Sequence, residues 1–110
     1  MTMKRAVIAF LSWLWLLSSV AIAAPTVEIA IENHVFSPSQ LSVPAGQKVR
    51  LLVINRDATP EEFESYELNR EKVIAGDSKG VIFIGPLDAG DYPFFGEFNP
   101  KTAQGVIRAE

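Results

Sequence analysis

One stretch of the sequence decides the fold, VRLLVIN at residues 49–55. It is an almost continuous apolar run, as expected for a central β-strand that is covered on both sides. Upstream of it, the segment from Val27 to Glu32 alternates Val, Ile and Ile with Glu, Ala and Glu. This period of two is typical of a strand with one buried face. The two segments together predict the middle of a β-sheet.

Further short β segments are expected around these two, near residues 41–43, 63–66, 73–74, 80–84, 91–95 and 105–109. The connections between them contain glycine, proline and aspartate, the residues that favour turns. Seven or eight short strands at this spacing predict an all-β sandwich or barrel. The one exception that the sequence suggests is a short helical turn near Asn99 to Ala103.

The N-terminal segment, residues 1–23, has the layout of a secretory signal peptide. A basic start precedes an apolar stretch at residues 6–22, and Ala21-Ile22-Ala23 offers a small-residue cleavage site. Cleavage after Ala23 leaves one exported domain at residues 24–110. Because the apolar stretch is long for a signal, an uncleaved membrane anchor is the alternative.

Charge and sulfur content limit what the predicted domain can do. The chain has ten Lys and Arg against thirteen Asp and Glu, and Lys4 and Arg5 lie in the predicted signal, which leaves eight basic residues and a net charge of −5. This acidity argues against nucleic acid as a partner. The chain has no cysteine, and its two methionines are Met1 and Met3. The domain therefore has no disulfide and no soft ligand for a metal ion.

Four segments of the domain, at residues 36–46, 49–57, 90–94 and 105–107, resemble those of the cupredoxins in content and order. The resemblance implies a Greek-key β-sandwich. A finer similarity is to the cupredoxin-like domains of the EfeO type, which are associated with bacterial iron transport. That similarity rests on the strings DATPEEFES at 57–65, LNREKVI at 68–74, IGPL at 84–87 and FFGEF at 94–98.

The same resemblance identifies the positions at which cupredoxins bind copper. A type-1 copper ion is held by two imidazoles, a thiolate and usually a weak axial thioether. The corresponding positions here are Glu61, Gly96, Asn99 and Ala103. A domain without cysteine or methionine cannot supply the sulfur ligands elsewhere. The sequence therefore excludes type-1 copper.

Hard ligands remain near the same end of the expected sandwich. The candidate metal ligands are Glu61, Glu62, Glu64, Glu97 and His34, with Tyr66 and Asn99 as weaker candidates. Such a set suits iron, or copper held weakly, and a group of acids attracts cations. On a strand, Glu62 and Glu64 would share one face with Tyr66, whereas Glu61 would point with Phe63. The alternatives are a solvated acidic loop and, for His34, a role in capping a turn.

Two functional interpretations follow from these features. In the first, a periplasmic metal-binding protein accessory to iron uptake binds iron and delivers it to a membrane iron permease or another periplasmic component. If it is an enzyme, the resemblance implies a ferroxidase-like activity with a partner, but binding and delivery is preferred. In the second, a metal-free interaction module docks on a membrane transport partner. Contact with the membrane is expected only through that partner or through an uncleaved signal.

Overall fold

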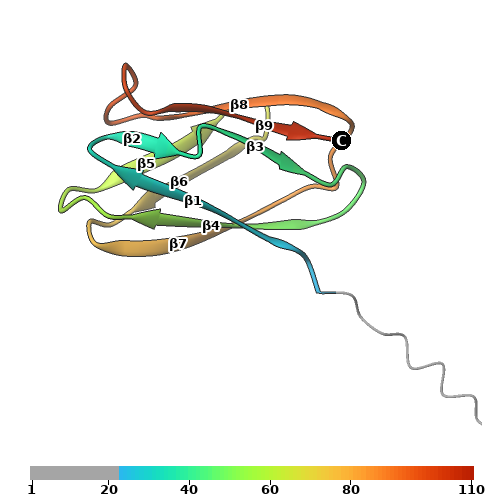
Figure 1. Cartoon of the computed structure of the whole chain (residues 1–110), viewed down its shortest axis with the longest axis horizontal. Coiled ribbons are helices and arrows are strands. Elements are labelled where there is room, and N and C mark those ends of the chain that lie inside the picture. Colours follow the sequence, from blue (N-terminus) through green and yellow to red (C-terminus); the bar gives the residue numbers. More distant parts are fainter. Residues whose placement is uncertain (1–22) are drawn as a thin grey trace, which may run out of the picture.

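Nine β-strands form in the computed structural model, which describes residues 23–110 (Figure 1). They are β1 (Thr26–Glu32), β2 (Val35–Ser37), β3 (Gln40–Val43), β4 (Val49–Asn55), β5 (Glu61–Ser65), β6 (Arg70–Ile74), β7 (Ser78–Ile84), β8 (Gly90–Gly96) and β9 (Gln104–Ala109). The all-β prediction is confirmed. The helical turn expected near Asn99 to Ala103 is a hydrogen-bonded turn, in which the Ala103 N–H donates to the Asn99 carbonyl at 2.9 Å.

The expected number of strands, seven or eight, was one or two short of the nine observed. The strand that the sequence did not predict is β2. It has only three residues, and Phe36 is buried between exposed Val35 and Ser37, which is too short a run to show a period of two. The predicted signal peptide lies outside the described residues, apart from Ala23. Within residues 23–110, no helix is long and apolar enough to cross a membrane.

The strands are arranged in two sheets that pack face to face (Figure 1). One sheet has four strands in the order β2-β1-β4-β7, and the other has five in the order β3-β9-β8-β5-β6. The pairs β1/β4 and β3/β9 are parallel, and the remaining neighbours are antiparallel. This is the two-layer sandwich that the sequence predicted.

Strand β4 lies between β1 and β7, so its central position was predicted correctly. The prediction that both of its faces are covered was wrong. Its exposure alternates along the strand, with Val49, Leu51 and Val53 buried and the residues between them half-buried. In a sandwich of two layers the outer face of each sheet has no further layer on it, so only one face of β4 is in the core.

Three phenylalanines fill the core near one end of the sandwich. Phe36, Phe63 and Phe94 come from β2, β5 and β8, and each is at most 2% exposed. The ring of Phe94 lies 5.0 Å from that of Phe36 and 5.1 Å from that of Phe63, between centroids. These contacts fix β5 and β8, which carry the candidate site, against the opposite sheet.

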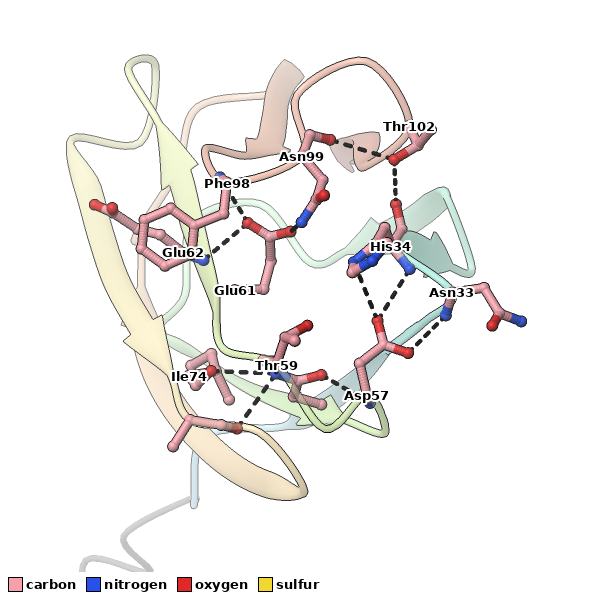
Figure 2. Close-up of polar contacts among 12 residues, drawn as sticks. Asn33, His34, Asp57, Thr59, Glu61, Glu62, Ile74, Phe98, Asn99 and Thr102 are labelled. Atoms are coloured by element: carbon pink, nitrogen blue, oxygen red, sulfur yellow. Dashed lines mark hydrogen bonds and ion pairs between the residues drawn. The ribbon is translucent and has the colours of Figure 1, made fainter.

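The turn between β1 and β2 is held by a carboxylate from another loop. Asn33 and His34 have positive φ angles of 53° and 58°, as in the two-residue hairpins that twist correctly with their strands. Asp57 accepts the Asn33 N–H at 2.7 Å and the His34 N–H at 3.0 Å (Figure 2). The Asp57 side chain is 15% exposed. It therefore ties the loop after β4 to the β1–β2 turn.

Removal of this tie by Asp57→Ala should lower the free energy of unfolding at pH 7 by about 1–3 kcal/mol, measured in urea. The His34 N–H, and then the Asn33 N–H, lower the pKa of Asp57 from its usual 3.8 despite some burial. The stabilisation is therefore complete above that value and is lost as the pH falls through the lower folded pKa. The difference between the variant and the wild type should shrink accordingly in acid.

Asp88→Asn serves as the matched control, because Asp88 is exposed and its side chain makes none of these contacts. Its stability should follow that of the wild type across the same pH range. An Asp57→Ala variant as stable as the wild type at pH 7 would contradict the assignment.

Candidate metal centre

Strand β5 presents two different faces. Phe63 and Ser65 are buried on the core side together with Glu61, which is only 1% exposed. Glu62 and Glu64 alternate with them and therefore lie on the outer face of the five-stranded sheet. This is the alternation that the sequence predicted for these residues.

Three glutamates meet on that outer face. One carboxylate oxygen from each of Glu62, Glu64 and Glu97 lies within 4.8 Å of the others, and we call these residues the acidic triad. Glu97 follows β8 directly, and its N–H donates to the Glu62 carbonyl at 2.9 Å. The triad thus joins two neighbouring strands, as expected for ligands that converge on one ion.

A fourth glutamate borders the acidic triad. In the register of β5 and β6, Glu71 lies directly opposite Glu64. Like charges directly opposite one another in a sheet are unfavourable. The ion pairs in residues 23–110 join His34 to Asp57, Arg56 to Glu32 and Arg108 to Asp91, so none of them involves these four glutamates.

Two members of the triad, Glu62 and Glu64, are partly withdrawn from water. Burial raises the pKa of Glu62, and the charges of Glu97 and Glu71 raise it further. Burial likewise raises the pKa of Glu64, with added contributions from Glu71 and Glu97. Glu64 is 9% exposed, and its Oε2 atom is buried without a hydrogen-bond partner among the described residues. A cation would relieve both the repulsion and the unpaired oxygen.

Glu61 faces the other way and has its own partners. Its Oε1 atom accepts the N–H groups of Glu62 and Phe98, each at 2.9 Å. Its Oε2 atom accepts the side-chain amide of Asn99 at 2.7 Å. Figure 2 shows this carboxylate enclosed by the three donors. Two of the predicted ligands, Glu61 and Asn99, are therefore bound to each other rather than to the triad.

The four positions that correspond to copper ligands do converge in space. A Cβ atom added to Gly96 would lie 2.6 Å from the Glu61 Cδ atom and 2.7 Å from the Ala103 Cβ atom. Asn99 touches the same carboxylate. Two of these residues offer no ligand atom, and the other two are hydrogen-bonded together. The residues do not fit type-1 copper, which needs the thiolate that this chain lacks.

The last two predicted ligands, His34 and Tyr66, are not members of the triad. His34 is in the β1–β2 turn, with Nδ1 3.6 Å from the Asp57 carboxylate, and its carbonyl accepts the Thr102 hydroxyl at 2.6 Å. Tyr66 is 75% exposed, and its ring packs against that of Phe95 at 5.5 Å. The structure thus unites Glu62, Glu64 and Glu97 of the seven candidates.

Sequence reasoning missed Glu71 as a neighbour of the site. The signal was available, because a four-residue turn at residues 66–69 separates β5 from β6. A hairpin closed by the pair Ser65 and Arg70 necessarily places residue 64 opposite residue 71.

Comparison with known proteins identifies the family. The cupredoxin-like domain family matches residues 6–109, and the chain belongs to this family. It is also 44% identical over 81 residues to an uncharacterized protein of Rickettsia prowazekii (strain Madrid E), a match that covers 74% of this chain. The chain spans about two thirds, 65%, of the length of that relative.

Solved structures share the fold at low sequence identity. Auracyanin A, a blue copper protein of Chloroflexus aurantiacus, matches with a TM-score of 0.68 and 15% identity over 80% of this chain and 100% of that one. Amicyanin of Paracoccus versutus matches with a TM-score of 0.63 and 18% identity over 82% and 86%. The metal-binding domain of the Cu(I)-exporting P-type ATPase of Streptococcus pneumoniae matches at 0.62 and 19% over 77% and 84%. These likenesses concern the fold alone.

Repulsion within the triad predicts that its loss stabilises the metal-free protein. Glu64→Gln keeps the shape of the side chain and removes one of several neighbouring like charges, so the midpoint of thermal unfolding in EDTA should rise. Glu67→Gln, at an exposed position in the turn at residues 66–69, should leave the midpoint nearly unchanged. Circular dichroism at neutral pH measures both. A lower midpoint for Glu64→Gln would show that this carboxylate is stabilising as it stands.

Proposed function

We propose that the protein is a periplasmic cation-binding protein of a bacterial iron-uptake system, and that its acidic triad binds the cation. One observation carries the proposal: within residues 23–110 the buried Oε2 atom of Glu64 has no hydrogen-bond partner, and it belongs to a group whose carboxylate oxygens lie within 4.8 Å of one another. A buried unpaired oxygen costs free energy, and a cation at this point would compensate for it.

The donor set selects the class of cation. The acidic triad offers only carboxylate oxygens, which suit hard ions such as ferric or ferrous iron, manganese, calcium and magnesium. Iron is favoured because Glu62, Glu64, Glu71 and Glu97 all lie in the strings that resemble the EfeO type, at residues 57–65, 68–74 and 94–98. The identification of iron as the ion rests on that resemblance.

Binding and delivery suit this geometry better than oxidation of the ion. Glu62 is half-buried and Glu97 is exposed, so an ion at the triad would keep part of its hydration and exchange readily. The triad supplies no thiolate or imidazole to stabilise a second redox metal. We infer that the ion passes to a membrane permease, with the exposed side of the acidic triad as the point of transfer.

A metal-free docking module is the second candidate. It is favoured by the apolar residues beside the triad, since Tyr66 is 75% and Val73 is 55% exposed, and Val73 lies opposite Glu62 in the sheet. An acidic surface bordered by such residues suits a basic partner. A calorimetric titration with metal ions distinguishes the two candidates.

Calorimetric titration of the purified protein should detect one site for an iron ion, with Fe(II) under anaerobic conditions and Fe(III), Mn(II), Ca(II) and Cu(II) in parallel. Glu64→Gln and Glu97→Gln should each weaken binding by about tenfold or more, which corresponds to about 1.4 kcal/mol. Glu67→Gln, outside the triad, should bind as the wild type does. If no ion binds more tightly than about 1 mM, the metal-binding proposal is wrong and the docking module is left as the candidate to test.

A further inference from the structure

The side chain of Glu61 joins strand β5 to the turn at residues 97–103. The carboxylate is 1% exposed and lies between β5, which carries it, and the turn at residues 97–103. Phe98 and Asn99 of that turn donate to it at 2.9 and 2.7 Å, and the Glu62 N–H donates from β5 (Figure 2). These bonds bridge two segments that are far apart in the sequence.

The space around the carboxylate is shaped by two very small residues. Gly96 has no side chain, and a Cβ atom there would come within 2.8 Å of Glu61 Oε1 as well as 2.6 Å of Cδ. Ala103, which is fully buried, contributes only a methyl group. The Gly96 N–H donates to the Ala103 carbonyl at 2.8 Å, so both residues are held at this point. A side chain at residue 96 would therefore clash with the carboxylate.

The partners of the carboxylate are all neutral donors. Two are backbone N–H groups and the third is a side-chain amide. The ion pairs within residues 23–110 involve other residues. Convergent neutral donors around a desolvated anion are the chemistry of an anion-binding site. A carboxylate is acceptor-only, so it satisfies all three donors at once.

We propose that this pocket is an anion-binding site whose resident ligand is the protein's own Glu61 carboxylate. The tie between β5 and the turn at residues 97–103 then takes the place that a bound metal ion has in related domains. The pocket accepts a free small carboxylate when the Glu61 side chain is shortened. This inference does not rest on the proposed function, since Glu61 points away from the acidic triad.

Rescue by acetate tests the proposal directly. Glu61→Ala removes a CH₂–COO⁻ group, and acetate has nearly the same size and charge as the missing fragment. The variant should unfold at a lower temperature than the wild type, and sodium acetate should raise its midpoint in a saturable manner. Wild-type protein, whose pocket is filled, should respond no more to acetate than to sodium chloride of equal ionic strength.

Acetamide, neutral and of similar size, should rescue Glu61→Ala less than acetate does. If the variant is unfolded from the start, acetate should restore its β-sheet circular dichroism signal, and failure to do so would count against the proposal. A Glu61→Ala variant as stable as the wild type, or an equal response of both proteins to acetate, would overturn it.

A charge exchange with Asn99 gives an independent test. Asn99→Asp alone brings a second carboxylate to the Glu61 oxygen that the amide contacts at 2.7 Å, so it should lower the unfolding midpoint. In a Glu61→Gln background the new carboxylate meets no like charge and can accept from the glutamine amide, so the same substitution should lower the midpoint much less. An Asn99→Asp effect of the same sign and size in both backgrounds would show that the two side chains are not coupled.

Discussion

The hydrogen bonds of the Glu61 carboxylate are the constraint on which this end of the domain depends. A carboxylate that is 1% exposed is tolerated only where donors replace the water that it has lost. Its donors come from β5 and from the turn after β8, so the two segments must stay together. That alignment also sets Glu97 beside Glu62 on the outer face. The Glu61 carboxylate on the core side thus determines where the acidic triad forms on the outer face.

Within its five residues, strand β5 carries carboxylates in two opposite hydrogen-bonding environments. On the core side, Glu61 has a donor for each of three acceptor positions. On the outer side, Glu64 has a buried oxygen for which the described part of the chain supplies no donor. Natural domains commonly give up some stability where a ligand is to be bound. The number of hydrogen-bond donors therefore distinguishes the two carboxylates: Glu61, which has three, is structural, and Glu64, which has an unpaired oxygen among the described residues, is a candidate ligand.

Much of the fold was predictable because its strands carry local patterns, as the alternation in β1 and the apolar run of β4 illustrate. Strand β2 was not, since three residues are too few for a period to appear. In the site, alternation alone separated Glu62 and Glu64 from Glu61. The approach of Glu97 to them depends on the register between β5 and β8, which is set by tertiary packing and leaves no trace in either segment.

The parallel pairing of β3 with β9 has a consequence for the kinetics of folding. Leu41 lies beside Ile107, so β3, at one edge of the larger sheet, is held there by β9, which lies more than 60 residues further along the sequence. Bringing these two strands together costs loop-closure entropy before their contacts form. Domains dominated by pairings between distant parts of the sequence therefore fold slowly. Strand β3 therefore has no partner in its sheet until β9 has docked beside it, which makes this parallel pair a late step in folding.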